Sequence, residues 1–270
     1  MSIFRNRGKR PEMAISEREL SQMTRDMDEL HESTFPQVRK TLDDMAVNLG
    51  KMVRQPSSRR GFVLGAAGAV ALGAAAACSS GQTGAAGSSS AAPTSGPAGG
   101  GELYTGDLKV VALAAALENL AVTAYDGALK KASAGQLGAV PPAVATFVQT
   151  AMKQHADHAQ GWNAVLSKAG KPTIMDAPLT ITQSQVDMLN AAKSVPDVAK
   201  LALSLENAAA QTYTFAAANV SDAGGIMTAA TIQPVEAMHA AILNFVLGQY
   251  PAPDSFIGID SAVKPDALMR

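Results

Sequence analysis

Six ionisable side chains interrupt apolar stretches in the second half of the chain. Two are single carboxylates and four form pairs spaced three residues apart: Glu118, Glu206, His155 with His158, and Glu236 with His239. Residues three apart share one face of an α-helix. A buried carboxylate is costly unless it is paired or bound to a cation. The pattern therefore predicts a site where carboxylates and imidazoles meet, and a metal ion would offset the cost of burying them.

The segments that carry these residues are rich in Ala and Leu, which is typical of α-helices. Gly and Pro residues mark the gaps between them. We expect four long helices, over residues 107–132, 142–168, 196–219 and 224–248. The connection between the second and third helices is expected to contain a short helix near residues 183–193. Residues 250–270 are expected to form an irregular tail.

The same short patterns occur twice, which indicates an internal duplication. Leu-Glu-Asn, followed by a tyrosine, begins at Leu117 and again at Leu205. Likewise the segment from His155 to Leu166 corresponds to the one from Glu236 to Leu247. The predicted fold class is all-α: a four-helix bundle made of two related helical hairpins, with a long crossover between helices two and three.

The order of these residues resembles the ferritin-like di-iron carboxylate bundles, which carry Glu on helices one and three and Glu-x-x-His on helices two and four. The resemblance covers residues 105–249 and implies six metal ligands: Glu118, His155, His158, Glu206, Glu236 and His239. His155 departs from the pattern, because the family has a Glu there that usually bridges two irons. A neutral imidazole binds one metal through one nitrogen. The resemblance thus implies one or two transition-metal ions, iron first, with manganese or zinc as alternatives.

Two tyrosines lie two helical turns after the single carboxylates. Tyr125 follows Glu118 and Tyr213 follows Glu206, on nearly the same helix faces. In the family such positions hold hydrogen-bond donors or redox tyrosines around the metal. The alternative is an aromatic ring that fills the bundle with its hydroxyl satisfied. Pro234 is expected to bend its helix or to begin the part that carries the site, because it lacks a backbone donor.

The segment before the predicted bundle contains an export signal. The motif SRRGFVL at residues 58–64, with Arg59 and Arg60, resembles a bacterial twin-arginine (Tat) signal, and an uncharged run follows it. Cys78, the single cysteine, comes directly after three alanines and resembles a lipoprotein processing site. It would then be the lipid-bearing first residue of the mature protein. The alternatives are a free thiol or cleavage at the Ala-x-Ala pattern.

A helical segment broken near Phe35-Pro36 is also expected before the signal. Its apolar seam would consist of residues at helical spacing: Leu20, Met23, Met27 and Leu30, then Val38, Leu42, Met45, Leu49 and Met52. The alternative is that translation starts at Met52. Five parts are predicted: a cytoplasmic helical segment (1–57), the signal (58–77), a flexible Ser/Gly/Ala tether (78–104), the bundle (105–249) and the tail (250–270).

Charge and composition narrow the function. A net charge of −1 at pH 7 argues against a basic nucleic-acid binder, and one cysteine rules out a disulfide framework. We expect a protein exported by the Tat machinery and held by lipid at the outer face of the cytoplasmic membrane. It would bind metal and act as a metal oxidase, a peroxide-consuming protein or a metal handler, with O₂ or peroxide as the small oxidant; whether it is an enzyme stays open. The alternative, favoured by His155, is a non-enzymatic interaction module with a decayed metal site.

Overall fold

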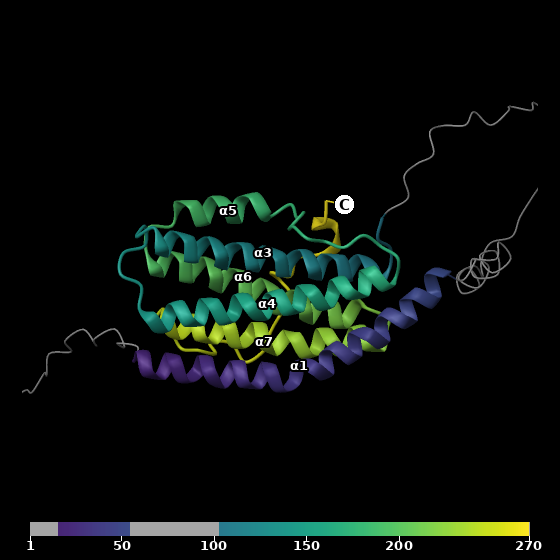
Figure 1. The fold of residues 1–270 in the computed structure, drawn as a ribbon, viewed down its shortest axis with the longest axis horizontal. Helices are drawn as coiled ribbons and strands as arrows, with labels where there is room; N and C mark the ends of the chain where they lie inside the picture. Colours follow the sequence, from purple (N-terminus) through teal and green to yellow (C-terminus); the bar gives the residue numbers. More distant parts are fainter. Residues whose placement is uncertain (1–15, 55–102, 270) are drawn as a thin grey trace, which may run out of the picture.

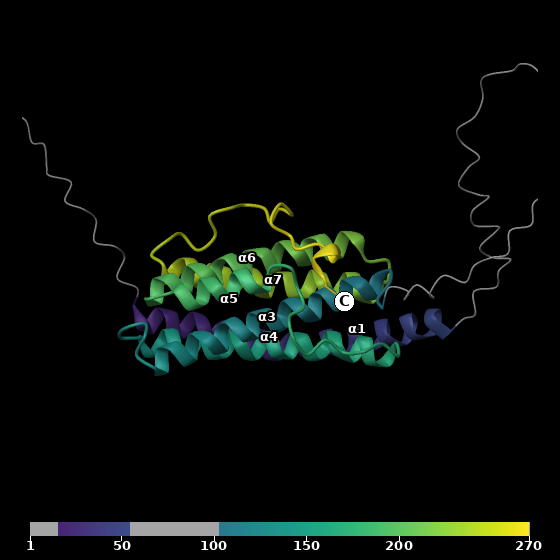
Figure 2. The same ribbon diagram turned by 90° about the horizontal axis from the view of Figure 1, so that it is seen from above.

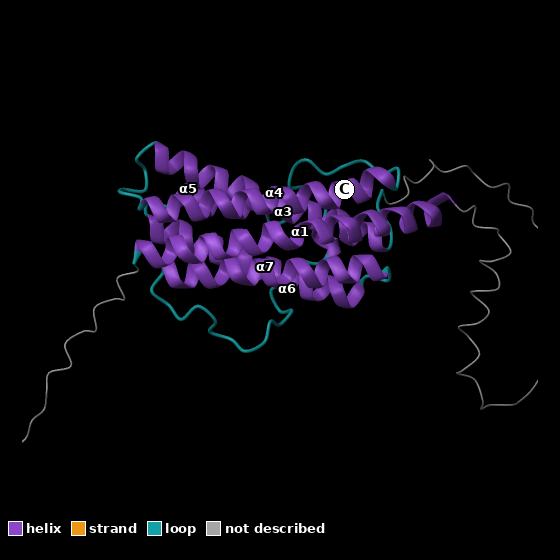
Figure 3. Cartoon of the chain, turned by 60° about the horizontal axis from the view of Figure 1, so that its bottom comes forward, coloured by secondary structure: helices purple, strands orange, loops and turns teal. Residues whose placement is uncertain are grey.

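The computed structural model describes residues 16–54 and 103–269. Over these residues the chain is helical and has no strand, which confirms the predicted fold class (Figure 3). The helices are α1 (Glu17–Arg54), α3 (Asp107–Ser133), α4 (Pro142–Lys168), α5 (Thr182–Ala191), α6 (Val195–Asn219) and α7 (Ala223–Val246), followed by the short 3₁₀ helix η1 (Pro265–Ala267). Arg59, Arg60 and Cys78 lie outside the described residues, so the signal and the lipid anchor stay predictions.

The helix boundaries follow capping signals in the sequence. Pro142 occupies the first turn of α4, where a missing backbone donor does no harm. The side chains of Ser194 and Asp222 accept hydrogen bonds from backbone N–H groups at the starts of α6 and α7. The predicted helices therefore agree with the structure to within about two residues, the usual uncertainty of helix ends. α7 runs through Pro234, and the part of the helix that carries Glu236 and His239 follows the proline.

The bundle consists of two hairpins, α3 with α4 and α6 with α7, that lie side by side (Figure 2). α5 covers the side formed by α3 and α6, whereas α1 packs along α4 and α7 on the opposite side (Figure 1). By length and composition α3 is apolar enough to cross a membrane. Most residues of its most apolar 18-residue stretch are buried in the bundle, however, and a helix that packs within a large core needs this composition.

Asparagines repeated in the two hairpins fasten the loops that leave them. The amide of Asn163 donates to the carbonyl of Ile174 at 2.7 Å and accepts from its N–H at 2.7 Å, which fixes the start of the crossover. Asn119 donates to the same carbonyl at 2.8 Å. Asn244, the counterpart of Asn163, donates to the carbonyl of Pro251 at 3.3 Å. These side chains satisfy loop backbone that would otherwise be left without partners.

Helix α1 corrects two sequence-based expectations. The predicted break near Phe35-Pro36 is wrong, because α1 continues through Pro36 as one bent helix (Figure 1). A proline removes one backbone donor, and burial of the neighbouring Phe35 and Val38 against the bundle offsets that loss. Leu30, expected in an apolar seam, is 49% exposed, and the buried face instead passes through His31.

Glycines on the bundle let α1 approach closely. A Cβ at Gly161 of α4 would stand 2.6 Å from Cδ1 of Leu42. At Gly224 of α7 it would stand 3.0 Å from the backbone oxygen of Thr41. A side chain at Gly161 would displace the end of Leu42, and one at Gly224 would press on the backbone of α1, so glycine favours the close contact at both positions. α1 is therefore built into the core of the folded chain.

Candidate metal centre

Two carboxylates on opposite hairpins form one side of the site. Glu118 on α3 and Glu206 on α6 are almost completely buried, at 2% and 1% exposure. Each accepts a short hydrogen bond from a tyrosine of the other hairpin: Tyr213 donates to Glu118 and Tyr125 donates to Glu206. The tyrosines are therefore core residues and at the same time hydrogen-bond donors to the candidate ligands. Both sequence-based interpretations of Tyr125 and Tyr213 apply together.

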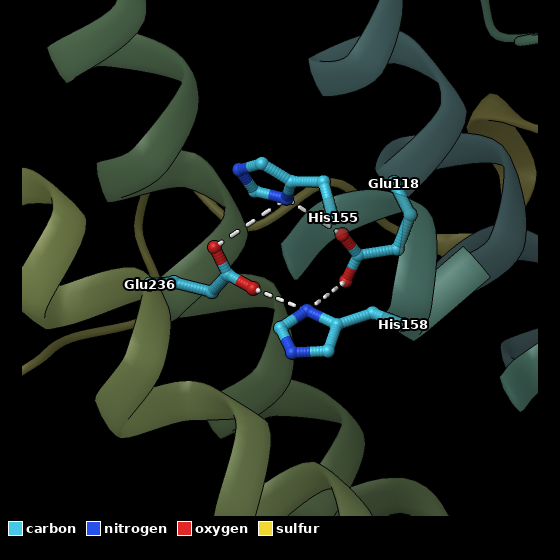
Figure 4. A group of neighbouring side chains, drawn as sticks. All are labelled: Glu118, His155, His158 and Glu236. Carbon is cyan, nitrogen blue, oxygen red and sulfur yellow. Dashed lines mark hydrogen bonds and ion pairs between the residues drawn. The ribbon is translucent and has the colours of Figure 1, made fainter. Parts of the chain in front are cut away.

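The two pairs spaced three residues apart face these carboxylates from α4 and α7. All six side chains predicted as ligands are buried, and their ligand atoms form two groups in which every atom lies within 4.8 Å of the others. One group contains Glu118, His155, His158 and Glu236, and the other His155, Glu206, Glu236 and His239 (Figure 4 shows the first). The structure thus brings every predicted ligand to one place.

Glu236 belongs to both groups through different oxygens. Its Oε1 lies 3.2 Å from Nδ1 of His158, and its Oε2 lies 3.3 Å from Nδ1 of His239. Ligands bound at about 2.1 Å to one tetrahedral ion are separated by roughly 3 to 4 Å. Glu236 is therefore placed as a carboxylate that could contact two ions.

His155 occupies the middle of the site, where the family pattern has a carboxylate. Its Nδ1 lies 2.7 Å from Oε2 of Glu118, and its Nε2 lies 3.1 Å from Oε1 of Glu206. It could bind an ion in either group through one nitrogen but not in both as a neutral imidazole. Two ions would thus receive unequal ligand sets, four protein ligands at one and three at the other.

An independent observation indicates that these six residues could hold a metal ion. Nδ1 of His158 and Oε1 of Glu236 are buried and face each other at 3.2 Å, within ion-pair distance, but neither makes a hydrogen bond among the described residues. Buried polar atoms are rarely left unsatisfied without a reason. Both atoms belong to the first group of ligands, so a cation bound there would satisfy both.

Mutual pairing controls the ionisation of the metal-free site. Burial alone would raise the pKa of Glu118, but His158 and His155 outweigh it and lower that pKa to about 2. Burial alone would lower the pKa of His158, but Glu118 and Glu236 raise it to about 9. The same balance raises the pKa values of His155 and His239. Carboxylates and imidazoles therefore stabilise each other's charged forms.

Sequence reasoning missed three polar residues behind the histidines. His31 of α1 is 2% exposed and has its Nε2 3.3 Å from Nε2 of His158. Gln154 accepts at Oε1 from Nε2 of His239 at 2.9 Å and donates from Nε2 to Asp28 of α1 at 3.0 Å. The available signal was the spacing Met27, His31, Phe35, Val38, which continues one helix face through the proline.

The centre has little free space beside it. A cavity of about 20 Å³ touches Glu118, His155 and Glu206 and is otherwise lined mainly by apolar side chains of α3 and α6. That volume holds roughly one water molecule. Only a very small molecule fits beside these residues without movement of the helices.

An all-helical bundle of two related hairpins that buries a carboxylate and imidazole cluster defines the class of this protein. Residues 106–249, more than half of the chain, match the family model described as a ferritin-like domain. The chain belongs to the ferritin-like domain family. No match was found among curated proteins or among solved structures. Helix α1, which supplies His31, precedes the matched region.

Proposed function

We propose that this protein binds one or two transition-metal ions in the centre of its bundle and reacts there with a small oxidant such as O₂ or peroxide. Iron fits the carboxylate and imidazole ligands, and manganese or zinc could take the same donors. The observation that carries the proposal is the buried pair without hydrogen bonds, Nδ1 of His158 and Oε1 of Glu236, inside a cluster of six potential ligands.

The protein's own groups would position the reaction. Glu236 would be shared by two ions, and the hydroxyls of Tyr125 and Tyr213 hold one oxygen each of Glu206 and Glu118. When bound, a redox-active metal would supply electron transfer or Lewis acidity. The small cavity beside Glu118 would admit a molecule the size of O₂ or peroxide and exclude larger substrates.

Metal analysis of the full-length protein tests the proposal. Protein purified from the cytoplasm after growth with iron, manganese and zinc should contain between one and two equivalents of metal. The triple variant Glu118→Ala, Glu206→Ala, His239→Ala should lose the metal and the stabilisation that metal binding provides. Less than about a tenth of an equivalent in the wild-type protein, also after anaerobic reconstitution, would contradict metal binding.

A second candidate function follows from His155. Both of its nitrogens already reach carboxylates, Glu118 and Glu206, so this part of the cluster is satisfied without metal. The bundle would then be a non-enzymatic interaction module whose site has lost its chemistry. In that case the triple alanine variant should bind no less metal than the wild type and should keep or gain thermal stability, because buried ion pairs can often be replaced without loss.

For location, we propose export through the Tat pathway and anchoring by lipid on Cys78 at the outer face of the cytoplasmic membrane. The support is the SRRGFVL motif and the cysteine that ends the apolar run. Because the Tat pathway carries folded proteins, α1 would dock on the bundle before export. Processing at Cys78 would then separate α1 from the mature protein.

Fractionation of cells tests this location. The wild-type protein should be found in the membrane fraction and should take up labelled fatty acid. Cys78→Ser should abolish the label, and replacing Arg59 and Arg60 together by Lys should keep the bundle in the cytoplasm. A wild-type chain that stays soluble, unlabelled and of full length would contradict both export and anchoring.

A further inference from the structure

Helix α1 reaches the outer ring nitrogens of two of the three histidines of the metal centre. His158 on α4 and His239 on α7 each direct Nδ1 towards Glu236 and the opposite nitrogen, Nε2, away from the centre. Nε2 of His158 contacts His31 of α1. Nε2 of His239 contacts Gln154, whose amide is oriented by Asp28 of α1. We propose that in the full-length chain, before processing at Cys78, α1 is a wall of the metal centre, whose His31 and Asp28 fix the orientation and tautomer of His158 and His239.

At His239 the hydrogen-bond partners allow only one position for the ring proton. Asp28, when ionised, can only accept a hydrogen bond, so the amide NH₂ of Gln154 faces it at 3.0 Å. The carbonyl oxygen of Gln154 therefore faces His239, and Nε2 of His239 donates to it at 2.9 Å. With its proton on Nε2, a neutral His239 presents the lone pair of Nδ1 to the carboxylates and to any ion between them.

At His158 the partner is a second imidazole. Nε2 of His31 lies 3.3 Å from Nε2 of His158, and one of the two must donate. Nδ1 of His158 faces Glu236 and Glu118, where a metal needs its lone pair, so Nε2 is the nitrogen that carries the proton. His31 accepts this hydrogen bond, and Phe35 stacks on its ring at 4.8 Å between centroids.

This assignment adds a helix outside the matched family region to the centre. Asp28 and His31 are three residues apart on α1, so they share one helix face and reach the two hairpins from the same side. Partners behind metal-bound histidines typically change metal affinity 10- to 100-fold. The affinity and the placement of the proton on Nε2 of His158 rest on the proposed metal binding, whereas the hydrogen bond from His239 to Gln154 does not.

The hydrogen bonds are tested first, in the metal-free full-length protein. The chain has four histidines, so ring-¹⁵N labelling gives a simple NMR spectrum. We expect a through-bond coupling between Nε2 of His31 and Nε2 of His158, and a protonated Nε2 in His239. Absence of the coupling together with a His239 protonated only on Nδ1 would overturn the proposal, and this result needs no variant and no metal.

Cobalt(II) is the probe for the effect on the centre. His31→Phe should weaken Co²⁺ binding about 10- to 100-fold and alter the visible spectrum of the bound ion. His31→Gln, whose amide oxygen can accept from His158, should recover most of the affinity. Asp28→Ala should weaken binding by a smaller factor, because Gln154 still contacts His239 after its outer partner is lost.

Glu32→Gln is the matched control. Glu32 lies next to His31, and the substitution removes its surface ion pair with Lys153 of α4 without touching the centre. It should leave affinity and spectrum unchanged. If His31→Phe keeps the wild-type affinity and spectrum, or if Glu32→Gln weakens binding as much, the positioning role is wrong. If wild-type protein binds no cobalt, metal binding fails, and the NMR result alone decides the hydrogen bonds.

Discussion

The two hairpins of the bundle are related by the internal duplication but contribute different residues to the candidate metal centre. The first, α3 with α4, contributes Glu118, His155 and His158, and the second, α6 with α7, contributes Glu206, Glu236 and His239. The equivalent positions differ in one residue only, His155 against Glu236. Protonated imidazoles would give the first hairpin's set a net charge of +1 and the second's −1. A single substitution in a duplicated site has thus made the halves electrostatically complementary.

This difference shows how a metal site can keep its geometry while its charge changes. With a Glu in place of His155, four carboxylates would face two imidazoles, and the halves would depend on a cation to offset their repulsion. With His155 they can pair directly, as the contacts of His155 with Glu118 and Glu206 show. Three predictions test how far the two hairpins differ.

The largest effect is expected from His155→Glu, which makes the two hairpins equivalent. Without metal the added buried carboxylate has no partner, and the protein should lose about 3 to 5 kcal/mol of unfolding free energy. With metal the stoichiometry should rise towards two, because both halves then offer a bridging carboxylate. Chemical denaturation and metal titration measure the two quantities.

His155→Gln is the control for this comparison, because it removes the imidazole without adding charge. It should lose less stability than His155→Glu in the metal-free protein. A metal-free His155→Glu variant as stable as the wild type would contradict the view that His155 balances the carboxylates.

The second prediction concerns pH and the metal-free protein. The raised pKa of His158, about 9 against 6.5 unfolded, contributes stability that is present below pH 6.5 and lost as pH rises through 9. The lowered pKa of Glu118, about 2, contributes stability that is present above pH 4.5 and lost as pH falls towards 2. Unfolding free energy should therefore drop by about 3 kcal/mol between pH 6.5 and 9.

Metal should reverse the alkaline part of this profile. A bound cation replaces protons on the imidazoles, so its binding becomes tighter as pH rises. Urea denaturation from pH 5 to 9, with and without metal, measures both curves. Metal-free protein that is equally stable at pH 6.5 and pH 9 would show that the hairpins are not held by imidazolium and carboxylate pairs.

The smallest effect separates the two tyrosines. Tyr125→Phe removes one hydrogen bond, to Glu206, whereas Tyr213→Phe removes the bond to Glu118 and leaves the indole N–H of Trp162 without its 2.9 Å partner. A hydrogen bond to a charged group contributes about 1.5 to 3 kcal/mol. Tyr213→Phe should therefore cost about 1 kcal/mol more than Tyr125→Phe in unfolding free energy. Equal losses would show that Trp162 finds another partner.

Helical periodicity and the internal duplication were enough to predict the bundle. Both signals can be recognised along the chain. Apolar residues repeat at helical spacing, and Leu-Glu-Asn followed by a tyrosine occurs twice, from Leu117 and from Leu205. The six candidate ligands could be identified for the same reason, since ionisable residues in an apolar helix need partners. That they converge is a geometric fact, and the ion that binds them stays a prediction.

The role of α1 could not be read from the chain. In the sequence, a stretch with the character of an export signal lies between α1 and α3, and it suggested two separate parts. Only tertiary packing brings His31 to His158, residues 127 positions apart. Periodicity states which face of a helix is apolar, but not which surface covers it, because that depends on shape: here on Gly161 and Gly224, which leave room for α1.

The sequence by itself determined the helices, the duplication and the six ionisable residues of the centre, because each depends on local spacing along the chain. The tertiary structure decided that His155 sits between two carboxylates, that each tyrosine serves the other hairpin and that α1 reaches both outer histidine nitrogens. These contacts join residues far apart in sequence, and their distances follow from how five helices pack together rather than from any pattern within one of them.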